Sequence, residues 1–304
     1  MSILNIGDAQ IHRIEEATYK FPLSMFNVDE ALIERHVSWL FPNFADTDNN
    51  WEMVVQSWIT IIDSKVIVVD PCVGNGRSFP TLPIFNMLET PFIERFEATG
   101  IRPEDVDYVF CTHLHSDHCG WNTKLRGGRY VPTFPNACYV MVKREYDRWD
   151  PARPGYDPAE QHNSLNAGVF ENSVRPVVEA GLAEFVPDTH RITKGLVVEP
   201  AYGHTAGHST LHLCSAGEEA YFTGDLFHHP LELLHPEIDA NTCERYPMTV
   251  ESRKRIIGEC LESGALIIPA HFAAPHAGYL RKRDGAVAWD YNLAPTRRHK
   301  ELRR

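Results

Sequence analysis

Short runs of apolar and β-branched residues recur along the chain, separated by polar and turn-forming residues. Runs of four to eight such residues are typical of strands that are buried on one or both faces. The pattern predicts strands at residues 10–15, 53–62, 65–70, 106–110, 137–142, 196–198, 220–222 and 265–268. The second and third of these are expected to form a hairpin that closes near Asp63 and Ser64.

Helical periodicity is found in fewer stretches, and each is bounded by a cap or a breaker. We expect helices at residues 29–39, with Asp29 as N-cap, at 91–100, ended by Gly100, and at 143–149, 163–180 and 249–263. Residues 124–135 and 150–158 are rich in glycine and proline and are expected to be loops. Strands interspersed with helices indicate a mixed α/β fold.

Two segments have two interpretations each. Residues 21–50 are unusually rich in aromatic side chains, which would either pack against the domain or form a lid or subunit contact over the site. Residues 150–165 contain the most turn-rich stretch, which would be either a domain boundary or an active-site loop. We favour the loop, because the candidate ligands on either side of it must meet in one place.

Residues 111–118, Cys-Thr-His-Leu-His-Ser-Asp-His, place three imidazoles and a carboxylate within six residues at the end of a predicted strand. Side chains two apart on an extended segment point to the same side. His113 and His115 can therefore bind one cation, while Asp117 and His118, beyond a turn, face a second position. Imidazole and carboxylate ligands suit zinc, iron or manganese.

Composition and charge narrow the classes of protein. The chain is 43% hydrophobic and 23% charged, as in ordinary globular proteins, and its net charge of -12 disfavours nucleic acid as a partner. The one basic cluster is the tail, residues 297–304. Neither a signal peptide nor a stretch long enough to span a membrane is evident, so we expect a cytoplasmic protein without a membrane partner. The seven cysteines lack paired spacing, and Cys111 and Cys119 are interpreted as packing residues.

The spacing His-x-His-x-Asp-His resembles the signature of the metallo-β-lactamase superfamily. Three later segments match that superfamily in type and order, namely Gly203-His204-Thr-Ala-Gly-His208, Thr223-Gly224-Asp225 and Pro269-Ala-His271. The resemblance covers roughly residues 51–290. It implies an αββα sandwich of two mixed β-sheets flanked by helices, formed by residues 1–304 as a single domain.

The resemblance also implies two divalent metal ions, zinc first, with manganese or iron as alternatives. One metal would be held by His113, His115 and His204, the other by Asp117, His118 and His271, with Asp225 bridging the two. Two cations that share a carboxylate can also share a hydroxide, which would be the nucleophile. Asp117 and Asp225 are therefore expected to take part in catalysis.

His228 lies three positions after Asp225, where lactonases of this superfamily carry a tyrosine that contacts the substrate oxygen. Its imidazole would donate a hydrogen bond to the developing oxyanion, which makes it the third candidate catalytic residue. The alternative is a loop histidine held by neighbouring carbonyls. Residues 70–76 resemble the superfamily's Asp-x-Gly turn at a strand end, and we expect Asp70 to support a ligand or the fold.

The function implied by the resemblance is hydrolysis of a small ester, above all a lactone, by a dinuclear metal centre. One alternative is an organophosphate or aryl-ester hydrolase, as in members similar to methyl parathion hydrolase. An alternative of another class is a mononuclear iron sulfur dioxygenase. The expected partner is the small-molecule ester or lactone, and a homodimer is a further expectation.

Overall fold

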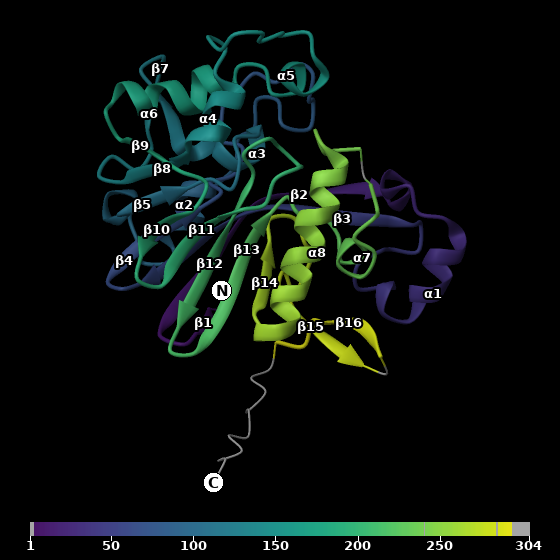
Figure 1. Cartoon of the computed structure of the whole chain (residues 1–304). Coiled ribbons are helices and arrows are strands. Elements are labelled where there is room, and N and C mark those ends of the chain that lie inside the picture. Colours follow the sequence, from purple (N-terminus) through teal and green to yellow (C-terminus); the bar gives the residue numbers. More distant parts are fainter. Residues whose placement is uncertain (1–2, 240, 284, 294–304) are drawn as a thin grey trace.

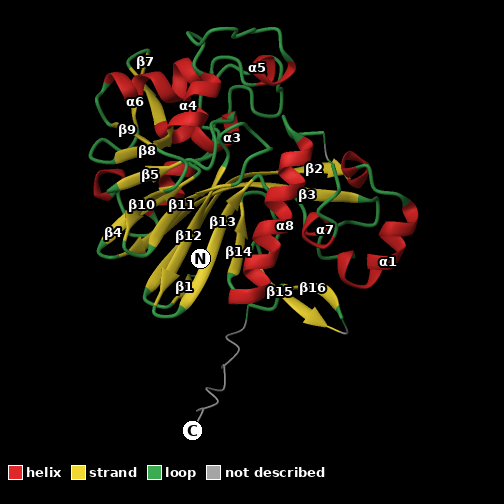
Figure 2. Cartoon of the chain, in the orientation of Figure 1, coloured by secondary structure: helices red, strands yellow, loops and turns green. Residues whose placement is uncertain are grey.

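The computed structural model describes residues 3–239, 241–283 and 285–293. The basic tail at 297–304 lies outside the described residues. Two seven-stranded sheets occupy the centre of the protein, and helices lie on the outside of both (Figures 1 and 2). The prediction of an αββα sandwich with two mixed sheets is confirmed.

The first sheet combines antiparallel and parallel strands. Its spatial order is β1 (Leu4–Ile6), β2 (Ala9–Pro22), β3 (Asn50–Ile62), β4 (Lys65–Val69), β5 (Tyr108–Phe110), β8 (Cys138–Val142) and β9 (Ala183–Val186). Strands β1 to β4 pair antiparallel, whereas β4, β5, β8 and β9 pair parallel. Parallel strands end at the same edge of a sheet, which places the loop after β5 at one edge of this sheet.

The second sheet is antiparallel except between β13 and β14. Its order is β10 (His190–Thr193), β11 (Leu196–Pro200), β12 (Ser209–Ser215), β13 (Glu218–Gly224), β14 (Leu266–Pro269), β15 (Gly278–Arg283) and β16 (Ala286–Asp290). A separate hairpin is formed by β6 (Thr123–Arg126) and β7 (Arg129–Pro132).

Most of the helices are short. They are α1 (Glu30–Leu40), α2 (Phe92–Glu97), α3 (Ser116–Cys119), α4 (Lys143–Trp149), α5 (Gln161–Leu165), α6 (Arg175–Glu179), α7 (Pro230–Leu234) and α8 (Tyr246–Ser263). Single 3₁₀ turns cover Leu23–Phe26, Pro103–Asp105 and Gly120–Asn122, and a π-helical turn covers Phe170–Val174. Figure 1 shows α8 lying in front of β13 and β14. None of the helices in the described parts of the chain is long and apolar enough to cross a membrane.

Three hydrophobic clusters follow from the alternation of side chains along the strands. In β13, Ala220 and Phe222 lie in the cluster between the two sheets, whereas Tyr221 lies in the cluster that also contains Ile256 and Ile257 of α8. A third cluster packs helix α2 and its neighbours against the first sheet. Because both faces of the central strands are buried, their sequences are almost continuously apolar.

The best-predicted elements have clear local signals. The hairpin of β3 and β4 turns at Asp63 and Ser64, both at positive φ. Helix α4 has the predicted bounds. In α1, the Asp29 side chain accepts a hydrogen bond from the Leu32 N–H at 2.7 Å, so Asp29 is the N-cap as expected.

Three local predictions were wrong. Residues 124–135 were expected to be a loop, but β6 and β7 form a hairpin there that turns at Gly127 and Gly128. The helix expected at 163–180 is broken into α5, a π-helical turn and α6, with Gly168 at φ 82° between the first two. The strand expected at 10–15 is longer, since β2 runs from Ala9 to Pro22, past a bulge near Glu15.

The aromatic segment at 21–50 contributes Phe26 and Phe44 to the cluster that also contains Ile267 of β14 and Ile256 of α8. Phe26 and Trp51 have ring centroids 5.0 Å apart, and the ring of His229 lies 5.3 Å from that of Phe26. The His229 Nε2 also lies 3.0 Å from the Phe44 carbonyl oxygen. The segment therefore has packing contacts with the domain, and its further role as a lid or subunit contact stays a prediction.

Candidate metal centre

The seven candidate ligands come from five loops or helices that meet at the ends of strands from both sheets. His113 and His115 follow β5, Asp117 and His118 lie in α3, His204 lies between β11 and β12, Asp225 follows β13, and His271 follows β14. The structure brings all seven together, although they are spread over nearly 160 positions of the chain. They form two groups that match the two predicted ligand sets.

The first group contains His113, His115, His204 and Asp225, whose ligand atoms all lie within 4.8 Å of one another. His115 Nδ1 lies 3.0 Å from His113 Nε2 and 3.0 Å from His204 Nε2. Asp225 Oδ2 lies 3.4 Å from His204 Nε2. Three imidazole nitrogens and one carboxylate oxygen therefore converge on one position.

The second group contains Asp117, His118 and His271, also within 4.8 Å of one another. Asp117 Oδ2 lies 3.5 Å from His271 Nε2. The other oxygen of Asp225, Oδ1, lies 3.1 Å from His118 Nε2 and 3.0 Å from His271 Nε2. Each oxygen of Asp225 thus faces a different group, as a bridging carboxylate requires.

The donor atoms fit divalent cations. His118 Nε2 and Asp225 Oδ1 are buried and lie 3.1 Å apart, but neither makes a hydrogen bond of good geometry within the part of the chain that the structure describes. Such atoms are costly unless a cation or water occupies the position between them. Burial holds the pKa of His113, His115 and His204 well below the usual histidine range, which favours the neutral imidazole that metals bind. Burial alone raises the pKa of the Asp225 carboxyl, but His118 and the other imidazoles lower it well below its usual range.

The far ring nitrogens of the ligands are oriented by oxygen atoms. His113 Nδ1 lies 3.1 Å from Thr112 Oγ1, and His271 Nδ1 lies 2.9 Å from the Val54 carbonyl oxygen. His118 Nδ1 lies 3.1 Å from Asp70 Oδ2. Such contacts fix the tautomer and orientation of a ligating imidazole.

Asp70 has the supporting position expected from the sequence. Besides its contact with His118, its carboxylate accepts hydrogen bonds from the Thr112 N–H at 2.7 Å and the Thr112 hydroxyl at 2.8 Å. It thereby joins the end of β4 to the start of the ligand loop. Cys111 and Cys119 are buried and belong to neither ligand group, in agreement with a packing role.

His208 supports the bridging aspartate. It is fully buried, its Nδ1 lies 3.0 Å from the Ala201 carbonyl oxygen, and its Nε2 accepts a hydrogen bond from the Asp225 N–H at 3.2 Å. Gly224 has φ 50°, and a Cβ there would lie 2.4 Å from Thr112 Oγ1 and 2.8 Å from His208 Nε2. A glycine before Asp225 is therefore required by both backbone and space.

Glu145 of α4 joins the two histidine-bearing loops and was not identified from the sequence. One carboxylate oxygen accepts hydrogen bonds from the Leu114 N–H at 3.0 Å and the Trp149 indole N–H at 2.6 Å. The other accepts from the Thr205 hydroxyl at 2.7 Å and the Gly207 N–H at 3.0 Å. The loops that carry His115 and His204 are thus held by a single buried carboxylate.

Glu145→Gln is expected to lower the free energy of unfolding by about 1–3 kcal/mol, because the amide nitrogen would face two donors and leave them unsatisfied. The measurement is urea-induced unfolding of the wild type and the variant. Glu171→Gln is the matched control, since Glu171 makes an exposed ion pair with Arg175, and such pairs contribute about 0.5 kcal/mol or less. Equal stability of the two variants would contradict the joining role of Glu145.

His228 lies against the bridging aspartate. Its Nε2 is 3.2 Å from Asp225 Oδ2, and its backbone N–H donates to Glu232 Oε2. Glu232 is fully buried and forms a 2.6 Å ion pair with Arg253, which is also buried. Burial alone raises the pKa of Glu232, but the Arg253 guanidinium outweighs it and the pKa is lowered to about 2. An ionised carboxylate therefore stands behind His228.

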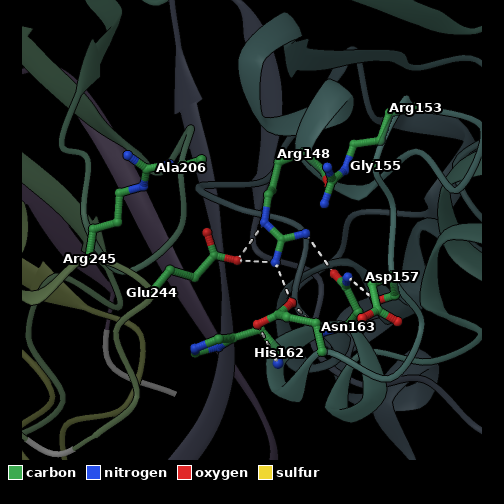
Figure 3. A pocket seen from close by; sticks show the side chains of 10 residues that line it. Arg148, Arg153, Gly155, Asp157, His162, Asn163, Ala206, Glu244 and Arg245 are labelled. Carbon is green, nitrogen blue, oxygen red and sulfur yellow. Dashed lines mark hydrogen bonds and ion pairs between the residues drawn. The ribbon is translucent and has the colours of Figure 1, made fainter.

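A pocket of about 320 Å³ borders the site. Glu244, on its wall, donates its backbone N–H to the His204 carbonyl oxygen at 3.0 Å. Figure 3 shows the guanidinium of Arg148 held by Glu244 and Asn163 in this wall. The lining residues are Arg148, Arg153, Gly155, Asp157, Glu160, His162, Asn163, Ala206, Glu244 and Arg245. Most of them lie in residues 150–165, so this segment lies beside the candidate centre, and its role as an active-site loop stays a prediction.

Comparisons with known proteins agree with this architecture. The hydrolase AbOPH, described as belonging to the beta lactamase superfamily, has a TM-score of 0.77 at 22% identity over 95% of this chain and 96% of that chain. AidC, a dizinc quorum-quenching lactonase solved with the product N-hexanoyl-L-homoserine, has a TM-score of 0.77 at 17% identity over 97% of this chain and 98% of that chain. At these identities the likeness shows the fold.

Sequence matches to curated proteins are local. The N-acyl homoserine lactonase AttM of Azorhizobium caulinodans is 38% identical over 55 residues, which are 18% of this chain and 18% of AttM. AttM of Agrobacterium fabrum is 34% identical over 55 residues, again 18% of each chain. The match thus spans less than a fifth of the length of these relatives.

The family match is much longer than these local matches. The description "Metallo-beta-lactamase superfamily" fits residues 51–283, which contain all seven candidate ligands. This match and the ligand groups bear out the prediction of a metal-dependent hydrolase. The chain therefore belongs to the metallo-beta-lactamase superfamily.

Proposed function

We propose that this chain is a dinuclear metal-dependent hydrolase of a small carboxylic ester, with a lactone as the leading substrate. The position of Asp225 carries the dinuclear part of the proposal. Its Oδ2 lies 3.4 Å from His204 Nε2, and its Oδ1 lies 3.0 Å from His271 Nε2. A single metal site would not require a carboxylate placed between two separate sets of ligands.

The proposed ligand assignment follows the two groups. His113, His115 and His204 would hold one cation, and Asp117, His118 and His271 the other, with Asp225 shared. When bound, two divalent cations, zinc in the first place, would acidify a water molecule and polarise the substrate oxygen. The residues of the chain fix the ligand geometry, and His228 presents an imidazole to the same space.

Lactones are proposed from the relatives' activities. AidC and AttM are described as lactonases, and AidC was solved with an acyl homoserine product. The pocket beside His204 contains arginine and carboxylate side chains, which suits a polar substrate more than a purely apolar one. Esters with a polar ring or amide group are therefore the first substrates to test.

Metal analysis tests the dinuclear assignment. We expect about two tightly bound zinc, manganese or iron ions at this centre, because seven ligands exceed what one tetrahedral or octahedral site accepts. The measurement is metal content per chain together with activity during titration of the metal-free protein. One tightly bound iron, with no gain of activity on adding a second metal, would instead favour the sulfur dioxygenase alternative.

A substrate screen tests the ester assignment. The metal-loaded protein is assayed against lactones, aryl esters, thioesters and phosphotriesters at equal concentration. We expect the highest kcat/KM with lactones, and the Asp225→Asn variant serves as the inactive control. A clear preference for phosphotriesters or aryl esters would replace the lactone assignment, while leaving the metal centre in place.

A further inference from the structure

The hairpin of β12 and β13 carries a second cluster of metal-binding side chains, separate from the catalytic centre. His212, Cys214 and Glu219 each offer one ligand atom, and these atoms lie within 4.8 Å of one another. None of the three is among the ligands described above. We propose that they form a peripheral site for a single zinc ion, with water completing the coordination.

The register of the hairpin places the three side chains on one face. Leu211 and Leu213 are fully buried between the sheets, so His212 and Cys214, at alternate positions of β12, lie on the opposite face. Glu219 of β13 is the register partner of Cys214. The cluster is therefore fixed by strand pairing and does not depend on a flexible loop.

The distances suit a tetrahedral zinc ion. His212 Nε2 lies 3.1 Å from Glu219 Oε2 and 3.3 Å from Cys214 Sγ. Zinc bonds to nitrogen, oxygen and sulfur of about 2.0–2.3 Å place tetrahedral ligands roughly 3.3–3.7 Å apart. The two distances from His212 Nε2 are thus within a few tenths of an ångström of those in a tetrahedral zinc site, and all three ligand atoms lie within 4.8 Å of one another.

The ring of His212 is already oriented for ligation through Nε2. Its Nδ1 lies 3.2 Å from Glu199 Oε1 of the neighbouring strand β11. Its face stacks on Tyr221, with ring centroids 4.1 Å apart and an interplanar angle of 10°. A carboxylate on the far nitrogen of a histidine is the usual support of a zinc-ligating imidazole.

A surface ion pair between His212 and two carboxylates would explain why Glu199 and Glu219 lie beside the ring. It would not explain why the Cys214 thiol lies there too. Cys214 Sγ faces the same ring nitrogen as Glu219, and Cys214 is exposed and free. A thiolate, an imidazole and a carboxylate together favour zinc over magnesium or calcium, which prefer oxygen ligands. The thiol is thus the group that distinguishes a metal site from a surface ion pair.

Cobalt provides a specific readout, because a thiolate bound to Co²⁺ gives a charge-transfer absorption in the near ultraviolet and the seven catalytic ligands include no cysteine. The full-length metal-free protein is titrated with Co²⁺. We expect this absorption in the wild type and its loss in Cys214→Ser. With zinc, the wild type should retain about one more ion per chain than Cys214→Ser, and the hydrolytic activity of the two should be equal.

Two control cysteines make the assignment specific. Cys138 lies beside Glu184 and belongs to none of the metal-binding groups found among the described residues, and Cys243 Sγ lies 4.0 Å from His204 Nδ1. Cys138→Ser and Cys243→Ser should both keep the absorption. If the absorption persists in Cys214→Ser, or is lost in Cys243→Ser, the peripheral site is wrong.

A further variant tests the orienting carboxylate. Glu199→Gln should weaken zinc binding at this site by about 10–100-fold, as expected for loss of a partner behind a ligating histidine. The thiolate absorption should reappear at saturating cobalt, because the three ligands remain. If Glu199→Gln binds zinc as tightly as the wild type does, His212 is not a ligand supported by Glu199, which contradicts the proposed geometry. Equal zinc contents of the wild type and Cys214→Ser would overturn the site itself.

Discussion

Asp225→Asn is expected to lower kcat/KM by more than about 100-fold, a larger effect than the loss of a residue that only supports a ligand. Asp225 faces both ligand groups, with Oδ1 toward His118 and His271 and Oδ2 toward His204. The amide removes one coordinating oxygen and one negative charge. Two cations bound a few ångströms apart would then repel each other with less compensation, so the more weakly held ion should leave first.

The measurement is metal content and steady-state kinetics of Asp225→Asn beside His271→Ala, which removes an outer ligand from one group only. We expect the aspartate variant to retain less metal and less activity than the histidine variant. Asp105→Asn is the matched control, because Asp105 pairs with Arg102 in an exposed 3₁₀ turn. Retention of both metals and near-normal turnover in Asp225→Asn would refute the bridging role.

The ligands could be predicted from the sequence because their signals are local. Each lies within one to eight residues of an apolar strand, and parallel or neighbouring strands place such loops at a common edge. The spacing in residues 113–118 further divides the four candidate ligands of this segment into two pairs, His113 with His115 and Asp117 with His118. Local spacing together with a superfamily resemblance therefore predicts the two groups of candidate ligands that the structure brings together.

Glu145 and Arg253, unlike Asp70, could not be predicted as supporting residues in the same way. Glu145 lies 60 positions before Thr205, and Arg253 lies 21 positions after Glu232, yet each pair is in direct contact. Nothing near Glu145 in the sequence distinguishes it from a solvent-exposed helix residue. Buried carboxylates become visible only when tertiary packing shows which donors surround them.

The broken helix at 163–180 has a related explanation. Apolar periodicity continued through the segment, but Gly168 adopts a positive φ and Pro176 cannot donate a backbone hydrogen bond. The turn allows Asn166 to donate its side-chain amide to the Leu114 carbonyl oxygen at 2.9 Å. The break in the helix thus coincides with a contact between Asn166 and the loop that carries His113 and His115. Such a long-range contact cannot be predicted from the periodicity of apolar residues.

His228→Phe is expected to lower kcat by about 10²–10³, some 2.7–4 kcal/mol, while raising KM far less. The imidazole lies 3.2 Å from Asp225 Oδ2, next to the proposed metal centre, and the backbone N–H of His228 donates to Glu232. A donor at this position would stabilise negative charge on the substrate oxygen as that charge develops. Its contribution would therefore fall on the transition state, with both metals and the fold retained.

The kinetics of His228→Tyr separate substrate contact from support of Asp225. A phenol can donate from a similar place, so this variant should recover part of the lost kcat, specifically toward lactones. If His228 acts by orienting Asp225, both substitutions should instead release metal. If it only holds the loop, both should lower the melting temperature and change kcat little.

His229→Phe is the matched control, because the His229 ring contacts the Phe44 carbonyl oxygen and Phe26 rather than Asp225. His229→Phe should lower the stability of the protein without lowering the kcat of the folded form. An unchanged kcat in His228→Phe would remove His228 from the mechanism.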